Sequence, residues 1–152
     1  MLDVVLIGFG LVALCVMIHA IGSTFWISLL AKRYLKVDGT WGEQRMFGAL
    51  LGTVVFLSSL HLVQIVAWAL AYRNLVPDEL QTFEEALYFS IVTFTTLGYG
   101  DITLSNGWRL LSGIEAISGI LLIGWTTAMI FAVVQHSWAG LYKRTNHRKQ
   151  QH

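Results

Sequence analysis

Three long apolar stretches constrain this chain of 152 residues more than any other feature of its sequence. They cover approximately residues 2–31, 47–71 and 108–134. An α-helix rises about 1.5 Å per residue, so about 20 apolar residues cross a hydrocarbon core about 30 Å thick. Each stretch is therefore long enough to span a membrane. We expect an all-α membrane protein with three transmembrane helices.

The composition supports a membrane protein and excludes several other classes. Charged residues make up 12% of the chain, whereas a soluble domain usually carries about 25%. Ten Lys and Arg residues against nine Asp and Glu residues give a net charge of +1, which argues against a nucleic-acid-binding protein. Cys15 is the single cysteine, so no disulfide can form within the chain. Ser, His and acidic residues show no arrangement that indicates an enzyme.

The first stretch is expected to remain in the mature protein, because its apolar run exceeds the 7–15 residues of a signal peptide and no Lys or Arg precedes it. Cytoplasmic loops carry an excess of Lys and Arg, and eight of the ten basic residues lie in two segments of this chain. These are Lys32, Arg33, Lys36, Arg45, Lys143, Arg144, Arg148 and Lys149. We therefore expect a multi-pass protein of the plasma or bacterial inner membrane, with its N-terminus outside and its C-terminus in the cytoplasm.

Residues 72–107 connect the second and third stretches and are too polar to form a further span. Thr82 followed by Glu85 fits a capping box, and the spacing predicts a short helix that ends near Phe94. A helix of about a dozen residues cannot cross the bilayer, and both flanks lie on the same side. Non-helical backbone at membrane depth is tolerated only where it is buried in protein or lines a water-filled cavity. This segment is therefore predicted to be a re-entrant loop beside an aqueous path.

Residues 95–101 follow the short helix and read TTLGYGD. This motif resembles the potassium-channel signature TTxGYGD in every fixed position, and residues 47–136 are similar to the two-helix potassium-channel pore. A Gly-rich turn would explain Gly98 and Gly100, but not both threonines, the tyrosine and the position after a re-entrant helix. Backbone carbonyls can replace water around a cation in a narrow pore. The two glycines permit the left-handed backbone conformations that such a carbonyl ladder needs.

The resemblance implies a set of K⁺ sites in this motif. The ion-binding residues are expected to be Thr96, Leu97, Gly98, Tyr99 and Gly100, with the carbonyls of the first four as the oxygen ladder. The Tyr99 side chain is expected to point away from the pore axis and pack against the short helix. Bound K⁺ ions are the only metal implied, and no cofactor is expected.

Further residues are expected to support the filter from behind: Tyr88, Phe89, Thr93, Thr95, Asp101 and Glu115. Tyr88 and Phe89 stand where many family members carry two tryptophans. Val92 stands where some relatives carry a glutamate, so Asp101 is expected to lack that carboxylate partner.

The third stretch resembles the inner, pore-lining helix, because Arg109, Gly119 and Gly124 keep the spacing found in some family members. Gly119 then matches the gating-hinge glycine, whereas Gly124 is interpreted as a site of close helix packing. Four residues are expected to line the cavity: Ile120, Ile123, Thr127 and Phe131. Their spacing of three, four and four residues places them on one helical face.

Glu115 lies within this apolar stretch, where an ionised acid costs about 2.5–3.5 kcal/mol. Acids at membrane depth are usually paired or protonated, and the hydroxyls of Ser90 and Thr93 are the predicted partners. A structural brace and a gating or proton sensor are both open interpretations of Glu115. Other polar side chains in the stretches are interpreted as interhelical hydrogen-bonding groups: His19, His61 and Gln64.

One re-entrant loop cannot encircle an ion, so four copies and a homotetramer are expected. The chain then divides into an accessory N-terminal helix, a cytoplasmic linker, an ion-channel pore domain and a basic cytoplasmic tail, which cover residues 1–33, 34–46, 47–136 and 137–152. Within the pore domain we expect an outer helix, a pore helix, a filter and an inner helix, over residues 47–71, 82–94, 95–101 and 107–136. Its partners are expected to be K⁺ and membrane lipids, and not nucleic acid.

These features favour a potassium-selective channel that conducts K⁺ passively. A weakly selective monovalent cation channel and a pore-loop subunit of a potassium-uptake transporter are the alternatives. Transporters of that kind resemble several fused pore repeats with a single filter glycine, unlike the single loop and full GYG here. A non-conducting scaffold would predict a damaged filter motif, and none is visible.

Overall fold

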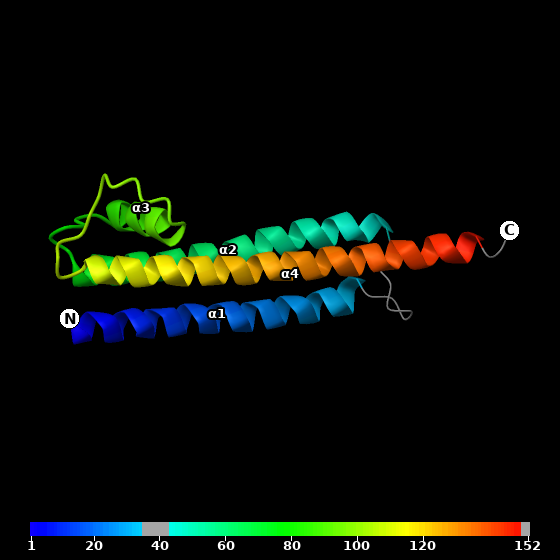
Figure 1. Ribbon diagram of the computed structural model, residues 1–152, viewed down its shortest axis with the longest axis horizontal. Coiled ribbons are helices and arrows are strands. Elements are labelled where there is room, and N and C mark those ends of the chain that lie inside the picture. The colour runs from blue at the N-terminus through cyan, green and yellow to red at the C-terminus, as the bar shows by residue number, and fades with distance from the viewer. Residues whose placement is uncertain (35–42, 150–152) are drawn as a thin grey trace. The chain divides into compact units, whose positions relative to one another are not determined.

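The computed structural model describes residues 1–34 and 43–149 (Figure 1). Within these residues the chain forms four α-helices: α1 (Leu2–Tyr34), α2 (Glu43–Leu75), α3 (Phe83–Phe94) and α4 (Arg109–Lys149). Three segments of them are long and apolar enough to cross a membrane, namely Leu2–Arg33, Phe47–Leu75 and Arg109–His136. The expected all-α fold with three membrane-spanning helices is confirmed.

The helices extend beyond the apolar stretches that predicted them. α2 begins at Glu43 and ends at Leu75, rather than covering residues 47–71. It ends two residues before Pro77, which cannot donate a backbone N–H and disfavours helix in the residue before it. α4 begins at Arg109 and runs to Lys149, past the expected end at residue 136. Hydropathy predicts only the part of a helix that lies in lipid. Helical turns in polar sequence are therefore not predicted by it. Residues 35–42 of the predicted linker and 150–152 of the predicted tail lie outside the described residues.

The chain divides into two compact units. The first consists of Met1–Ala20 and Ser59–Gly124, and the second of Ile21–Ser58 and Trp125–His152. Figure 1 shows α3, in green, beside the final turns of α2 in the first unit. The core of this unit is formed by large apolar side chains that are almost fully buried: Trp68, Tyr72, Phe94, Leu111 and Leu122.

Polar side chains also join α1 to α2 within the first unit. Gln64 Nε2 donates to the backbone carbonyl of Cys15 at 3.2 Å and lies 3.3 Å from Nδ1 of His19. Its Oε1 lies 3.1 Å from Nδ1 of His61, and the two histidine rings are stacked with centroids 5.4 Å apart. Gln64 therefore uses both its amide protons and its oxygen here. The predicted interhelical hydrogen bonding is confirmed for His19 and Gln64, whereas the His61 bond to Gln64 lies within α2 and His61 meets α1 through ring stacking.

The second unit holds α1 and α2 together through Trp26. Its indole N–H donates to Thr53 Oγ1 at 3.0 Å, and the Thr53 hydroxyl donates to the carbonyl of Ala49 at 2.7 Å. The Trp26 ring stacks on Phe56 with centroids 4.5 Å apart. A Cβ at Gly52 would lie 3.3 Å from this ring, so the small residue admits the indole.

Candidate functional site

The candidate site starts from α3, whose ends are both capped. The predicted capping box is present: Glu85 N–H donates to Thr82 Oγ1 at 3.1 Å, and Thr82 N–H donates to the Glu85 carboxylate at 3.0 Å. At the other end, the backbone N–H and the hydroxyl of Thr95 donate to the carbonyl of Ile91, at 3.1 and 2.7 Å. These bonds satisfy backbone groups that a helix leaves unpaired at its ends. α3 is therefore a well-defined base for the loop that follows.

The loop of residues 95–101, here called the filter loop, is tied to α3 by its backbone. The N–H groups of Leu97 and Gly98 donate to the carbonyl of Val92, at 2.9 and 3.3 Å. In a trans peptide, the N–H of one residue points opposite to the C=O of the residue before it, and the chain has no cis peptide among its described residues. The carbonyls of Thr96 and Leu97 consequently point away from Val92. These are two of the four carbonyls predicted to bind K⁺.

The φ angles of the filter loop alternate in sign. They are positive at Thr96, Gly98 and Gly100, with values of 60°, 54° and 78°. Leu97 and Tyr99 between them are not among the positive-φ residues. Left-handed backbone at the two glycines is the predicted conformation. Thr96 was not predicted to adopt it, because its Cβ makes this conformation unfavourable by about 1–2 kcal/mol.

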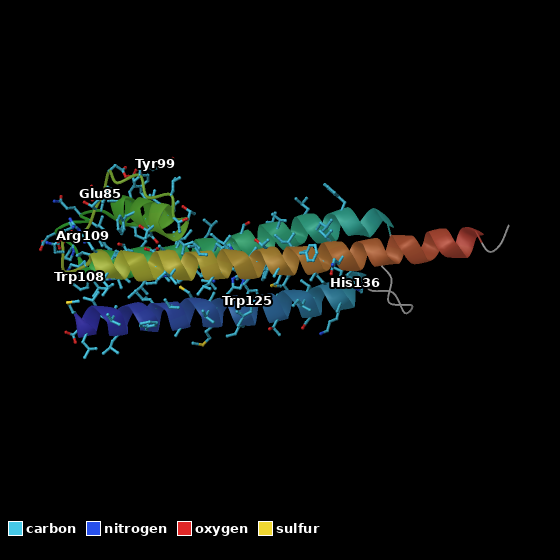
Figure 2. All side chains as sticks on the ribbon, viewed as in Figure 1. Glu85, Tyr99, Trp108, Arg109, Trp125 and His136 are labelled. Atoms are coloured by element: carbon cyan, nitrogen blue, oxygen red, sulfur yellow. The ribbon has the colours of Figure 1, made fainter. Side chains whose placement is uncertain are left out.

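The filter loop has little cover from its own chain. Leu97 is 53% exposed and Tyr99 67% exposed. Most of the Tyr99 side chain is therefore uncovered by its own chain, and its packing against α3 stays a prediction. Figure 2 shows Glu85, Tyr99, Trp108 and Arg109 gathered at the end of the first unit where α3 and its loops lie.

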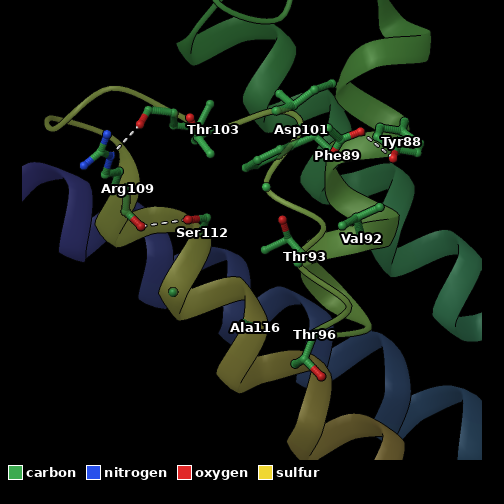
Figure 3. Close-up of a pocket in the computed structure, with 15 residues that line it drawn as sticks. Tyr88, Phe89, Val92, Thr93, Thr96, Asp101, Thr103, Arg109, Ser112 and Ala116 are labelled. Atoms are coloured by element: carbon green, nitrogen blue, oxygen red, sulfur yellow. Dashed lines mark hydrogen bonds between the residues drawn. The ribbon is translucent and has the colours of Figure 1, made fainter.

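A hydrogen bond ties the outer end of the filter loop to α3. The Tyr88 hydroxyl donates to Asp101 Oδ2 at 2.7 Å (Figure 3). This bond holds the pKa of Asp101 below its ordinary value and raises the pKa of Tyr88 above its own. Asp101 thus has a hydroxyl partner in place of the carboxylate partner that Val92 cannot provide. Tyr88 therefore contacts the filter loop, and its supporting role stays a prediction.

Phe89, the second member of the predicted aromatic pair, has a different environment. It is buried and packs edge-on against Tyr72 of α2, with ring centroids 5.1 Å apart. Adjacent residues on a helix point about 100° apart, so Phe89 turns toward α2 while it still lines the pocket beside the filter loop. Phe89 therefore fixes α3 to α2, whereas Tyr88 contacts the filter loop.

An open pocket of about 510 Å³ separates the filter loop from the start of α4 (Figure 3). Thr93, Thr96 and Gly98 line one side, and Ser112 and Ala116 of α4 line the other. Two hydrogen bonds hold the segment between the filter loop and α4. Arg109 Nε donates to the carbonyl of Leu104 at 2.8 Å, and Ser105 N–H donates to the Glu79 carboxylate at 2.7 Å.

Glu115 lies in the buried core of the first unit. Its Oε1 is 2.5 Å from Ser90 Oγ, and its Oε2 accepts a hydrogen bond from the Tyr72 hydroxyl at 2.7 Å. The prediction of Ser90 is confirmed. Thr93 is not the second partner, because it lies on the pocket side of α3. Tyr72 takes that place, and it was missed because it comes from α2, far away in the sequence.

The structure places close packing at Gly119 and not at Gly124, and the hinge role of Gly119 stays a prediction. A Cβ at Gly119 would overlap the backbone carbonyl oxygen of Phe94 and lie 2.9 Å from its carbonyl carbon. Gly119 is therefore the site of close packing, where α4 approaches the C-terminus of α3. A Cβ at Gly124 would meet nothing within 4 Å, so the close-packing interpretation of Gly124 is wrong for the described chain.

The four residues predicted to line a cavity are exposed: Ile120, Ile123, Thr127 and Phe131. Ile117 and Leu121, which were not predicted to line the cavity, are also more than 60% exposed. Exposure in one chain does not separate a cavity face from a lipid face, so the cavity assignment stays a prediction.

Comparisons with known proteins find related sequences. A family model described as "Ion channel" matches residues 59–136, just over half of the chain. The chain is 36% identical over 83 residues to a calcium-gated potassium channel of Thermoplasma volcanium, which is 53% of this chain and 24% of that protein. A protein of Rhodopseudomonas palustris with "potassium channel protein" in its name is 32% identical over 76 residues, 49% of this chain and 18% of its own length.

Protein LctB of Bacillus caldotenax is 27% identical over 114 residues, which cover 74% of this chain and 84% of LctB. In contrast, the matches to the Thermoplasma and Rhodopseudomonas proteins cover less than a quarter of the length of those relatives. No solved structure matches the chain.

Proposed function

This chain belongs to the potassium-channel pore-domain family of ion channels, and from that premise we propose that it is a potassium-selective channel. K⁺ would move passively down its gradient through the filter loop. Ion channels are not enzymes, and the three candidate spans make this a multi-pass membrane protein. We propose the potassium selectivity separately from the family. The relatives named as potassium channels match this chain over only part of their length.

One observation carries the proposal: the backbone geometry of the TTLGYGD motif. Its φ angles alternate, and the N–H groups of Leu97 and Gly98 are bound to Val92. The carbonyls of Thr96 and Leu97 are thus turned away from α3 and left available to a cation. Carbonyl oxygens of this kind substitute for the hydration shell of K⁺. In addition, the C-terminal end of α3 leads into this loop, and the partial negative charge there favours a cation.

The proposed K⁺ sites are the carbonyls of Thr96, Leu97, Gly98 and Tyr99, with Gly100 completing the backbone alternation. A single loop supplies one side of each site, so four chains around a common axis are needed. The exposure of Leu97 and Tyr99 in one chain supports such an assembly. The distribution of Lys and Arg supports an outside N-terminus and a cytoplasmic C-terminus.

The proposal is tested by ion flux into liposomes that contain the purified protein. We expect uptake of Rb⁺ and K⁺ far above that of Na⁺. Gly98→Ala should abolish selectivity or conduction, because an added Cβ opposes a φ of +54°. Gly107→Ala is the matched control, since a Cβ at Gly107 meets nothing within 4 Å and its φ is not positive.

Two outcomes would contradict the proposal. Equal Na⁺ and K⁺ flux would identify a weakly selective monovalent cation channel instead. Wild-type selectivity in Gly98→Ala would show that the filter loop does not select the ion.

A further inference from the structure

The Glu115 side chain is a titratable group in the core that ion conduction does not use directly. Glu115 has no exposed surface even in a single chain. The carboxyl joins three helices, because it belongs to α4, contacts Tyr72 of α2 and contacts Ser90 of α3. Burial within one chain means that assembly with further copies cannot add water to this site.

The protons around Ser90 can be counted. Its Oγ lies 2.5 Å from Glu115 Oε1 and 3.0 Å from the backbone carbonyl oxygen of Ile65. A serine hydroxyl has one proton to donate. If Glu115 were ionised, both neighbours would be pure acceptors, and one of these two oxygen pairs would have no proton between them. Two buried oxygens at these distances repel each other when no proton lies between them, even though the Ile65 carbonyl is also placed to accept a helical bond inside α2.

A proton on Glu115 removes this conflict. The acid then donates from Oε1 to Ser90 Oγ, and Ser90 donates its own proton to the carbonyl of Ile65. Tyr72 donates its hydroxyl proton to Oε2, the carbonyl oxygen of the acid. Every polar atom in the chain of contacts then has a partner.

We infer that Glu115 is a neutral carboxylic acid that donates to Ser90, in a directed chain of hydrogen bonds from Tyr72 to the Ile65 carbonyl. Both side-chain partners are uncharged hydroxyls, so no positive charge offsets a buried negative charge here. The neutral acid agrees with a position inside the candidate span Arg109–His136.

This hydrogen-bond chain makes Glu115 a positioning residue for the filter loop. Ser90 lies two residues before Val92, whose carbonyl holds the N–H groups of Leu97 and Gly98. Fixing Ser90 to α2 and α4 fixes the rotation of α3, and with it the direction of that carbonyl. The effect on conduction rests on the proposed function, whereas the location of the proton does not.

Infrared difference spectroscopy tests the protonation state directly. Wild-type protein and Glu115→Gln are compared in lipid bilayers at neutral pH. We expect the carbonyl stretch of a protonated carboxylic acid in wild type and its loss in Glu115→Gln. Loss of carboxylate bands instead would overturn the inference. This readout is independent of conduction, so it would still place the proton if the protein proved unselective.

The substitution series tests the positioning role. Glutamine has an N–H donor for Ser90 and a carbonyl oxygen for Tyr72, so it imitates the neutral acid. We expect Glu115→Gln to keep Rb⁺ flux within about twofold of wild type. Glu115→Ala and Ser90→Ala should lower it at least about fivefold, since each leaves buried polar groups unpaired.

Ser118→Ala is the matched control for Ser90→Ala. Ser118 is equally buried, but its hydroxyl donates only to the backbone carbonyl of Glu115 within α4, at 2.8 Å. We expect flux close to wild type in this variant. A loss in Glu115→Gln as large as in Glu115→Ala, or failure of Glu115→Gln to fold, would overturn the inference, because an ionised acid would then be required.

Discussion

At Asp101, a single hydrogen bond decides how one end of the filter loop is held. The Tyr88 hydroxyl donates to Asp101, and this contact lowers the pKa of the carboxyl from its ordinary 3.8 and raises the pKa of the phenol from its ordinary 10.0. The stabilisation from Asp101 is fully present above pH 3.8 and is lost as pH falls through its lower folded-state pKa. The stabilisation from Tyr88 is fully present below pH 10.0 and is lost as pH rises through its higher folded-state pKa. The bond therefore persists across the neutral range.

Tyr88→Phe removes this donor and should raise the pKa of Asp101 toward 3.8. The measurement is a titration of the Asp101 carboxyl by NMR in wild type and variant. Tyr99→Phe is the control, because it removes a phenol hydroxyl from the filter loop that does not donate to Asp101. Identical titration of Asp101 in Tyr88→Phe and wild type would show that the bond is absent in solution.

Individual residues also show what the sequence can and cannot reveal. Gly98 and Gly100 allow a positive φ to be predicted, because glycine adopts it without a steric penalty. Thr96 gives no such signal, and its φ of 60° follows from neighbouring bonds: its N–H donates to Thr93 and the next N–H to Val92. Ser90 was predicted as a partner of Glu115 because it lies on the back of the short helix that precedes the filter loop. Tyr72 required knowledge of how α2 packs.

Among the helices, the approach of α4 to the C-terminus of α3 depends on Gly119. A Cβ at this position would overlap the backbone of Phe94, and backbone cannot move aside as a flexible side chain does. Gly119→Ala should therefore destabilise the folded protein by about 1–3 kcal/mol, the range for overpacked sites. It should also displace the end of α3 that leads into the filter loop and so reduce K⁺ flux.

Thermal unfolding followed by circular dichroism, together with the liposome assay, measures both effects. Gly124→Ala is the control, since a Cβ there meets nothing within 4 Å and the exchange adds the same methyl group to the same helix. If both variants unfold at the wild-type temperature, the close contact between Gly119 and Phe94 does not exist. If only Gly119→Ala unfolds early, Gly119 acts through packing, whatever its contribution to gating.

The helices themselves were largely predictable, because each has a local physical cause. Hydropathy locates the three spans, and the capping box of Thr82 and Glu85 locates the start of α3. Their ends were less predictable. α4 continues to Lys149 in polar sequence, where neither apolar character nor a proline marks a boundary. The close packing at Gly119 rather than at Gly124 depends on which helix lies opposite, and the periodicity along one helix does not contain that information.

For the whole molecule, the open faces of a single chain point to assembly. The filter loop exposes two large apolar or aromatic side chains, with Leu97 53% and Tyr99 67% exposed, and it borders an open pocket of about 510 Å³. Exposed apolar surface of this kind marks interaction sites. We expect native mass spectrometry in detergent to give a particle of about 68 kDa, four times the 17.0 kDa of one chain.

Tyr99→Ala should shift this particle toward smaller species, because it removes the exposed Tyr99 ring of the filter loop and with it contact area between copies. Tyr88→Phe is the control: Tyr88 donates within its own chain, so the four-copy mass should persist. A monomer or dimer in the wild type, stable over a range of detergents, would contradict the tetramer, and with it any closed ring of carbonyls around an ion. If the tetramer persists in Tyr99→Ala, the closed arrangement of carbonyls is still possible. The contacts that stabilise the tetramer would then lie on other faces of the spans.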